Sequence, residues 1–420
     1  MEGASQDAWN NICSNSGSLL YIYPDLPLVS RVCGGNIMRF AKRLSKIPPY
    51  AFVELDRRKK EKLLEGIDVI DLGVGDPDIP TPKFIIEAMK KAIDDPANHR
   101  YPFGRGKQEL REAISSWYAR RFGVSLDPGR EIAVLIGSKE GLTHLPLALL
   151  DEGDTALIPD PGYPAYRSGV IFAGAKPVYF PLSLEDNYLP KVSSFPRREL
   201  DRTKLLFLNY PNNPTSAVAN GNAFEEIVHW AHDNNVVVAH DAAYSELYSG
   251  EKPISFLQTP GAKEIGVEFH SFSKTFNMTG WRIGWICGNP DVINALSQIK
   301  ENIDSGVFGA IQAAALVALT SPAAETEAGR MRDIYAERRN VLVPGLEKNG
   351  WHVFHSNATF YAWAGVPDSE SDVLWAERLL EKWGIVATPG SALGEHGGGF
   401  VRFSLTQPVE RIKQALDRMK

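Results

Sequence analysis

The chain of 420 residues has little cysteine, no excess of positive charge and no long apolar run. Three cysteines, Cys13, Cys33 and Cys287, are too few for a disulfide framework, and none has metal-ligand spacing. The net charge of −6 leaves no basic surface of the kind that binds nucleic acid. Charges interrupt the apolar stretches before the ~20 residues that a membrane-spanning helix needs. These absences predict a soluble, cytoplasmic protein with no metal site, no nucleic-acid partner and no membrane partner.

What is present is ordinary globular composition, with 44% hydrophobic and 23% charged residues and no internal repeat. The length predicts two to three domains. Residues 1–37 look unlike the rest of the chain, whose regular sequence begins near Met38. They show neither a secretory signal nor an Arg-rich transit pattern. Two interpretations stay open for them: a non-native extension upstream of a start at Met38, or a genuine but loosely ordered arm.

Short apolar runs recur through the first two thirds of the chain, each bounded by Gly, Pro, Asp or Asn. They cover residues 132–137, 155–162, 176–182, 204–211, 236–241, 267–273 and 282–288. Runs this short and this apolar are typical of strands that are buried on both faces of a sheet. Helical patterns such as residues 223–235 separate them. The alternation predicts an α/β fold with a mixed, mostly parallel sheet flanked by helices.

The C-terminal part follows a different pattern. Residues 324–349 are expected to form a long helix that bends near Pro344, and short strands alternate with two helices beyond it. This predicts a smaller α+β domain over 306–420, with the segment 38–82 packing against it and a large domain over 83–305.

Candidate chemistry is concentrated at the carboxyl ends of the predicted strands, where open α/β sheets bind ligands. Lys274, in the stretch "FHSFSKTFNMTGWRIGW", follows one of these strands. Burial or a nearby cation would lower the pKa of this lysine from about 10.4 and make its amine a nucleophile. Asp241 ends the preceding strand, where a buried carboxylate needs a partner such as a protonated pyridine nitrogen. A helix N-cap is the competing interpretation of Asp241.

Several other strand-end residues suit a phosphorylated ring cofactor, although each has a simpler structural explanation. Ser138 and Lys139 begin a predicted helix whose N–H groups could hold a phosphate, but serine there is more often an N-cap. Tyr163 could present its ring to a pocket or pack on its own domain, and Asn213 could bond a ring oxygen or belong to a rigid turn. The remaining candidates are Tyr244 for the ring oxygen, Ser271, Ser273 and Arg282 for the phosphate, and Arg402 for a substrate carboxylate.

Taken in order, the motifs "SKEG", "DPGYPAY", "NYPNNPT", "HDAAYSEL", "SFSKTFNMTGWRIGW" and "FVRFSL" resemble those of fold-type I pyridoxal-phosphate enzymes, the aspartate aminotransferase superfamily. The resemblance runs from about Met38 to the C-terminus. It implies pyridoxal 5'-phosphate as cofactor, Lys274 as the Schiff-base lysine, Asp241 paired with the pyridine nitrogen, and the other candidates in the roles given above. It also implies that Gly75 lines the substrate with its backbone, and that Tyr101 reaches the cofactor phosphate of the partner subunit in a homodimer.

Within the superfamily, segments such as "AKRLSKIPPYAFVELDR", "NIDSGVFGAIQ" and "GSALGEHGGGFVRFSL" resemble the LL-diaminopimelate aminotransferase group. That likeness implies that Tyr50, and Ser305 from the partner subunit, help frame the distal end of the substrate, and Lys139 and Asn213 are also expected to bind the substrate. Asp304 is a further candidate acceptor there. The chain departs from the pattern at Ser216, where the family has Gly, so the backbone angle at this position is in doubt.

The resemblance implies transfer of an amino group from LL-diaminopimelate to 2-oxoglutarate, or the reverse, in lysine biosynthesis. A broader aminotransferase acting on alanine, aspartate or an aromatic amino acid is the nearest alternative. A lyase and a non-catalytic regulator on the same fold are more distant ones.

Overall fold

The computed structural model describes residues 31–33, 36–38, 40–47 and 51–420. The chain divides into two compact units, Met1–Arg57 and Arg58–Lys420. The first unit contains a hairpin of β1 (Arg31–Cys33) and β2 (Asn36–Met38), the turn Lys42–Lys46, and the start of α3 (Ala51–Leu64). Tyr50 lies outside the described residues. So does most of the segment 1–37, so the two interpretations of that segment stay predictions. The fold described below belongs to the second unit.

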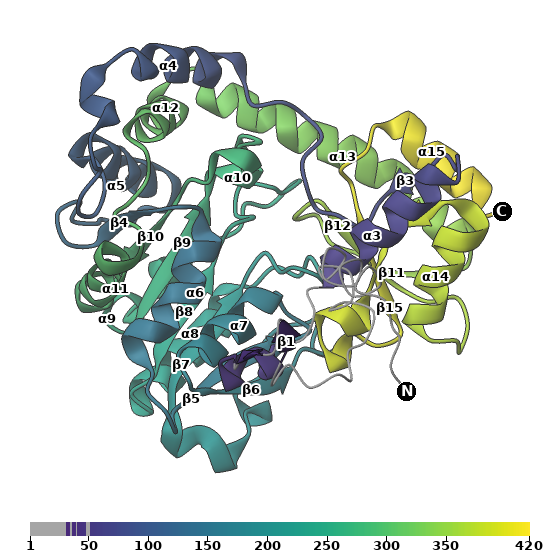
Figure 1. Cartoon of the computed structure of the whole chain (residues 1–420), viewed down its shortest axis with the longest axis horizontal. Coiled ribbons are helices and arrows are strands. Elements are labelled where there is room, and N and C mark those ends of the chain that lie inside the picture. Colours follow the sequence, from purple (N-terminus) through teal and green to yellow (C-terminus); the bar gives the residue numbers. More distant parts are fainter. Residues whose placement is uncertain (1–30, 34–35, 39, 48–50) are drawn as a thin grey trace. The chain divides into compact units, whose positions relative to one another are not determined.

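A seven-stranded sheet forms the centre of the second unit (Figure 1). Its order is β4-β10-β9-β8-β7-β5-β6. Strands β9, β8, β7, β5 and β6 are parallel, whereas β10 runs antiparallel to both of its neighbours. The strands are β4 (Ile132–Leu135), β5 (Thr155–Asp160), β6 (Lys176–Pro181), β7 (Thr203–Asn209), β8 (Val237–Asp241), β9 (Gly266–Ser271) and β10 (Gly284–Gly288). Each corresponds to one of the seven apolar runs, so the predicted mixed, mostly parallel sheet is confirmed.

Helices cover this sheet and explain why its strands are apolar throughout. Helices α6 (Ser138–Leu149), α7 (Pro164–Phe172) and α11 (Pro290–Ile303) pack on it, and their apolar side chains join those of the strands in one core. Helix α12 (Gly309–Thr320) packs against α4 (Lys83–Ile93) and α5 (Gln108–Phe122). Among the described residues, no helix combines the length and the apolar character needed to cross a bilayer.

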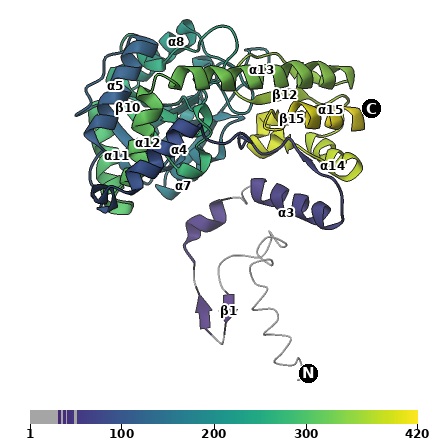
Figure 2. The same ribbon diagram turned by 90° about the horizontal axis from the view of Figure 1, so that it is seen from above.

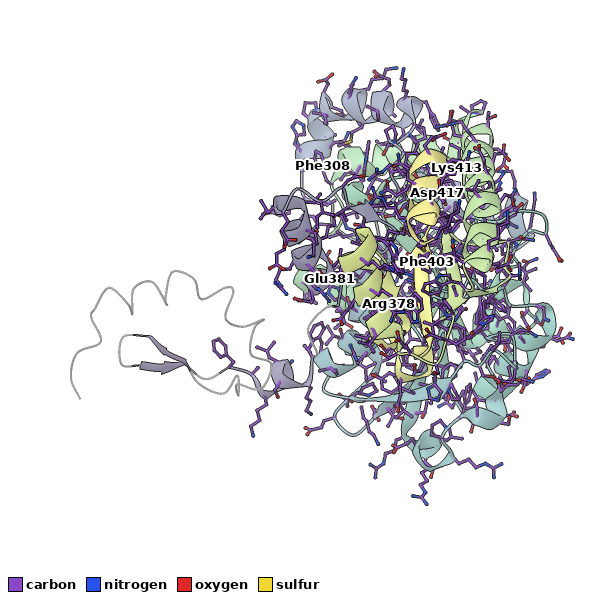
Figure 3. All side chains as sticks on the ribbon, turned by 90° about the vertical axis from the view of Figure 1, so that its right-hand side faces the viewer. Phe308, Arg378, Glu381, Phe403, Lys413 and Asp417 are labelled. Carbon is purple, nitrogen blue, oxygen red and sulfur yellow. The ribbon has the colours of Figure 1, made fainter. Side chains whose placement is uncertain are left out.

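A second, four-stranded antiparallel sheet has the order β11-β12-β15-β14. Its strands are β11 (His352–Phe354), β12 (Tyr361–Gly365), β14 (Thr388–Pro389) and β15 (Phe400–Ser404). A separate parallel pair joins β3 (Ile70–Asp71) to β13 (Ile385–Val386). Helices α13 (Ala324–Lys348), α14 (Asp372–Trp383) and α15 (Val409–Arg418) complete this part. Phe403 of β15 is fully buried, whereas Glu381, Lys413 and Asp417 lie on the outer surface (Figure 3).

This arrangement confirms the predicted class, a large α/β part with a smaller α+β part. The exact domain limits at 37, 82 and 305 stay a prediction. Helix α13 links the two parts, because it contacts α12 and also packs along α15 (Figure 2).

Two consecutive arginines of α13 anchor that helix to the small sheet. Arg338 makes a bidentate pair with Asp78, with Nη–Oδ distances of 2.7 and 2.8 Å. Arg339 is buried, and it donates three hydrogen bonds, at 2.6 to 2.9 Å, to the carbonyl oxygens of Ala358, Thr359 and Tyr361. Burial lowers the pKa of Arg339 to about 10, which still leaves its guanidinium charged at neutral pH.

We predict that Arg339→Met lowers the free energy of unfolding by about 3 kcal/mol, because three buried carbonyl groups lose their donor. Urea denaturation of purified protein measures this change. Arg330→Met on the same helix is the matched control, because Arg330 is exposed and, among the described residues, forms an ion pair only with Glu327. Its loss should be below about 1 kcal/mol. Equal losses for the two variants would contradict the anchoring role of Arg339.

Candidate active site

Lys274 lies on the short helix α10 (Phe272–Thr275), directly after β9. Its Nζ lies 3.3 Å from the carbonyl oxygen of Gly75, to which it donates, and 5.3 Å from the centre of the Phe360 ring. Burial lowers the pKa of Lys274 to about 8. The negative charge of Asp76 acts against this shift, and the positive charge of Arg282 adds to it. An amine with this pKa is substantially neutral near pH 8 and can act as a nucleophile or base.

Asp241 lies at the end of β8, and only 5% of its surface is exposed. Burial raises the pKa of its carboxyl group, whereas hydrogen bonds from the Tyr166 hydroxyl (2.8 Å) and the Ala243 N–H (3.3 Å) lower it. Residues 243–246 form turns and no helix begins there, so Asp241 is not a helix N-cap. The carboxylate makes no ion pair with any residue that the structure describes, so it can accept a cationic ligand.

Tyr166 was missed in the sequence, although it stands in the quoted motif "DPGYPAY". Its side chain is fully buried, and its ring stacks on Phe207 with centroids 4.9 Å apart. Tyr163, the N-cap residue of α7 three positions earlier, is half-buried and meets Tyr166 edge-on at 5.7 Å. The spacing of three between Tyr163 and Tyr166 could have pointed to Tyr166, because residues i and i+3 at a helix start lie on the same face.

The start of α6 and the Arg282 guanidinium come together at one end of this group. A Cβ placed on Gly137 would lie 2.4 Å from Arg282 Nη2, and a Cβ on Gly284 would lie 2.9 Å from the Ser138 nitrogen. Only glycine permits this close approach. Gly137 holds the N-cap position of α6, where no side chain caps the helix, so Ser138 is not an N-cap. Backbone N–H groups at such a helix start, together with a guanidinium, suit a phosphate.

The other predicted phosphate residues have local partners. Ser271 is buried and caps α10, since its Oγ accepts from the Ser273 N–H at 3.2 Å. Ser273 Oγ lies 3.5 Å from the Met278 carbonyl oxygen. Lys139 is exposed on the first turn of α6.

A second group of residues surrounds Arg402, whose side chain is 1% exposed on β15. Its Nη1 donates to Asn213 Oδ1 at 2.8 Å, and its Nη2 donates to the Gly73 carbonyl oxygen at 2.8 Å. The guanidinium also lies over the ring of Tyr361, 4.2 Å from its centre. Arg402 and Asn213, which are 189 positions apart in sequence, are therefore direct neighbours.

Tyr361 is a second residue that the sequence did not reveal. Its hydroxyl lies 3.1 Å from the hydroxyl of Tyr244, and burial raises the pKa of Tyr244 well above the usual range. A Cβ on Gly75 would lie 2.0 Å from Tyr361 Oη, which explains why glycine stands at position 75. Tyr361 lies on β12, one of the short strands that the sequence predicted beyond residue 349 without indicating a role in the site.

The doubt about Ser216 is resolved by its geometry. Its φ of 66° is the left-handed conformation that glycine adopts readily. Its hydroxyl lies 2.6 Å from Thr359 Oγ1 and donates to the Tyr361 carbonyl oxygen at 3.0 Å. These buried contacts offset the strain of a positive φ at serine.

Two predicted residues are not joined to this group by any contact among the described residues. Tyr101 is 75% exposed, and its ring stacks on Phe103. Ser305 follows α11 with a φ of 61°. The carboxylate of its neighbour Asp304 accepts from Lys300 Nζ and from the Gly306 N–H.

The chain matches one protein family, Aminotransferase class I and II, over residues 67–419. The chain belongs to the class I and II aminotransferase family.

This aminotransferase is 51% identical over 385 residues to a protein named LL-diaminopimelate aminotransferase from Aquifex aeolicus, covering 91% of this chain and 99% of that protein. The structure is similar to substrate-bound BacF from Bacillus subtilis, with a TM-score of 0.87 and 37% identity over 91% and 97% of the two chains. It is also similar to a single-mutant aspartate aminotransferase from Thermus thermophilus, with a TM-score of 0.85 and 31% identity over 91% and 99%.

Class I and II aminotransferases use pyridoxal phosphate, and the residues present fit that group. Asp241 shows this fit at one end of the site, because it is a buried carboxylate that forms no ion pair with a described residue. A protonated pyridine nitrogen is a cation of matching size and charge. At the opposite end, the N-terminus of α6 at Gly137, beside the Arg282 guanidinium, fits a phosphate dianion.

We predict that Tyr166→Phe raises the pKa of Asp241, because the carboxylate loses its strongest donor while its burial is unchanged. The acid limb of the pH profile of kcat/KM should move to higher pH, and kcat at pH 7 should fall by about tenfold. Steady-state kinetics across pH measure both effects.

Tyr210→Phe is the control, because it also removes one buried tyrosine hydroxyl, which bonds to the Tyr188 carbonyl oxygen. If Tyr210→Phe moves the acid limb as far as Tyr166→Phe, the assignment of Tyr166 is wrong.

Proposed function

We propose that this aminotransferase uses pyridoxal 5'-phosphate to interconvert LL-diaminopimelate and 2-oxoglutarate with tetrahydrodipicolinate and glutamate, a step of lysine biosynthesis. The observation that carries the substrate is the 51% identity over nearly the full length of a relative with that name. Further relatives with the same name are 46 to 48% identical over about nine tenths of the chain.

The cofactor, when bound, supplies an aldehyde that captures amines and a ring that withdraws electrons from the substrate α-carbon. In the proposed site, Lys274 would bind the aldehyde carbon, Asp241 would pair with the ring nitrogen, and Tyr244 and Asn213 would contact the ring oxygen. Tyr163 would cover one face of the ring. The phosphate would be held by Ser138, Lys139, Ser271, Ser273 and Arg282.

Lys274 performs the proton transfers in this proposal. Its pKa of about 8 leaves part of the amine neutral at physiological pH, so that Nζ could accept a proton from the substrate α-carbon and then donate it to the carbon that the cofactor's aldehyde contributes. A lysine at its usual pKa of about 10.4 would be almost wholly protonated and unable to accept one. The burial that lowers the pKa of Lys274 therefore makes this amine able to act as a base at neutral pH.

Asp241 supplies a fixed negative charge opposite the amine. Burial alone would keep its carboxyl group protonated to higher pH, and the hydrogen bonds from Tyr166 and Ala243 act against this. A cation beside the carboxylate lowers the pKa further. Asp241 would then stay ionised and hold the ring nitrogen protonated throughout the reaction.

Arg402 orients the substrate by its α-carboxylate. Its guanidinium is fixed by Asn213 and Gly73 and by stacking on Tyr361, so little side-chain freedom is lost on binding. A preorganised fork of this kind matches a carboxylate geometrically. The lack of a side chain at Gly75 lets the Tyr361 hydroxyl approach the backbone that is expected to line the substrate.

The proposed enzyme is a homodimer with shared active sites. The exposed rings of Tyr101 and Phe103 support this, because two large aromatic side chains rarely lie in water without a function. Tyr101 would reach the phosphate of the other subunit, and Tyr50, together with Ser305 of the partner subunit, would help frame the distal end of the substrate. Two copies would then be needed for each complete site.

A broader specificity is the second candidate, and the likeness to an aspartate aminotransferase favours it. The residues that hold the cofactor and the α-carboxylate serve either specificity. Only the groups that bind the distal end of the substrate distinguish them.

We predict that the purified protein forms glutamate from 2-oxoglutarate and LL-diaminopimelate, with kcat/KM at least about a hundredfold above that for alanine, aspartate or phenylalanine. A coupled glutamate assay measures each donor in turn. Lys274→Ala is the blank for contaminating enzymes, and it should lose at least about three orders of magnitude in rate. Brisk turnover of aspartate with none of LL-diaminopimelate would overturn the proposed substrate and leave the family assignment intact.

A further inference from the structure

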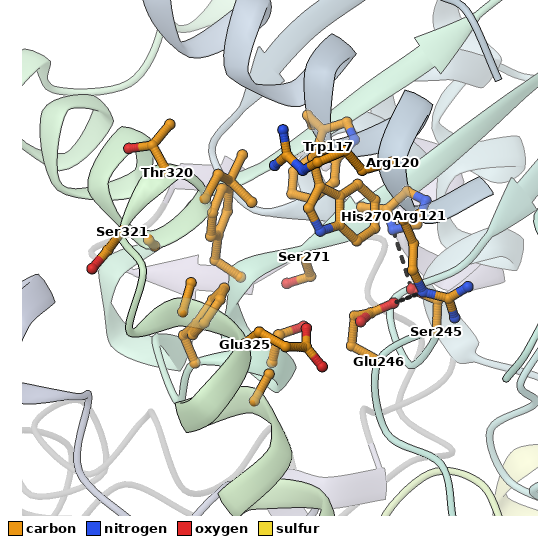
Figure 4. Close-up of a pocket in the computed structure, with 18 of the residues that line it drawn as sticks. Trp117, Arg120, Arg121, Ser245, Glu246, His270, Ser271, Thr320, Ser321 and Glu325 are labelled. Atoms are coloured by element: carbon orange, nitrogen blue, oxygen red, sulfur yellow. Dashed lines mark hydrogen bonds and ion pairs between the residues drawn. The ribbon is translucent and has the colours of Figure 1, made fainter. Parts of the chain in front are cut away.

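A cavity of about 490 Å³ lies in the second unit, outside the residues described for catalysis. Helix α5, helix α10, the segment 243–252 and the junction of α12 with α13 enclose it (Figure 4). Ligand pockets in proteins have volumes of about 300 to 1,000 Å³, so the space suffices for a small molecule. The lining does not include Lys274, Asp241 or Arg402; Ser271 is the one predicted site residue that borders it.

Aromatic side chains form the walls of this cavity. Trp117 and Trp285 meet edge-on with centroids 5.6 Å apart, and Phe272 meets Trp285 edge-on at 5.0 Å. The His270 ring stacks on Trp285 at 4.9 Å with an interplanar angle of 5°. Flat apolar walls of this kind favour a ligand with a flat apolar body.

The floor offers polar groups that are already oriented. His270 Nε2 bonds to the buried carboxylate of Glu268 at 2.7 Å, so this nitrogen carries the proton. The other ring nitrogen, Nδ1, faces the Ser245 hydroxyl at 3.4 Å (Figure 4). Both His270 and Ser245 line the cavity.

The mouth carries more positive than negative charge. Arg121 pairs with Glu246 at 3.0 Å, and Glu325 pairs with Arg332 at 2.5 Å, so the two acids of the lining are both neutralised. Arg120 and Lys252 also line the cavity, are exposed, and have no ion-pair partner among the residues that the structure describes. Two cations are therefore available to an anion.

We propose that this cavity is a second ligand site, which binds a small aromatic carboxylate, with its ring against the wall that Trp117, Trp285 and Phe272 form and its carboxylate toward Arg120 and Lys252. The ring would replace water on apolar surface, and the carboxylate would stay at the mouth, where its desolvation costs little. The site is independent of the substrate proposed above.

The experiment is calorimetric titration of the holoenzyme with phenylacetate, and with phenylacetamide as the uncharged analogue of the same shape. Phenylacetate should bind, and the amide should bind at least about tenfold more weakly. The double variant Arg120→Glu/Lys252→Glu should weaken phenylacetate binding by about tenfold or more and leave aminotransferase activity unchanged.

Two controls decide between sites. Arg402→Ala should leave phenylacetate binding intact, because that arginine belongs to the catalytic group. The double variant Arg197→Glu/Arg198→Glu makes the same change of net charge at exposed positions outside the cavity lining and should also leave binding intact.

Three results would overturn the proposal. One is no binding of phenylacetate at its highest usable concentration, and another is loss of binding in Arg402→Ala, which would place the ligand in the active site. The third is an equal effect of the Arg197/Arg198 and Arg120/Lys252 pairs, which would show attraction by net charge only. None of these results bears on the proposed diaminopimelate activity.

Discussion

Two groups that carry opposite charges in water, a carboxylate and an amine, are buried at neighbouring strand ends of the large sheet. Asp241 ends β8, and Lys274 follows β9, which pairs in parallel with β8. Burial raises the pKa of the Asp241 carboxyl group and lowers the pKa of the Lys274 amine, because it destabilises the charged form of each group. A cofactor that presents a cation to Asp241 and an aldehyde to Lys274 would relieve both costs at once.

A buried hydrogen-bond network holds the strands in place behind these ends. Glu268 of β9 has no exposed surface, and it accepts from His240 Nδ1 at 2.9 Å, from the Tyr118 hydroxyl at 2.8 Å and from the Phe256 N–H at 2.8 Å. Burial alone would raise its pKa, but the hydrogen bonds from His240 and His270 hold the pKa of Glu268 well below its usual range.

The network reaches a third strand through His240, which immediately precedes Asp241. Its Nε2 accepts from the Tyr210 N–H at 3.2 Å, where the chain leaves β7 toward Asn213. Strands β7, β8 and β9 are thus tied to one ionised carboxylate directly beneath the residues that they present. A fully satisfied buried network of this kind is rigid, which suits a site whose geometry must be maintained.

The sequence predicted the large sheet well, because strands buried on both faces are mostly apolar and end at turn residues. Motif order then predicted the roles of Lys274, Asp241 and Arg402. Tyr166 and Tyr361 could not be found in the same way, since their roles come from contacts across 75 and 117 positions, with Asp241 and Tyr244. The same limit applies to Glu268, which appears in the sequence as one polar residue inside a strand. Its partners come from three other segments.

The most direct test of the central claim is the pKa of Lys274 in the cofactor-free enzyme. Isotope labelling of the lysine side chains, with Lys274→Arg to assign the signal, gives this pKa from an NMR titration. The account predicts a value of about 8. A value near 10.5, the ordinary pKa of a lysine side chain, would show that the amine is solvated and would contradict the account.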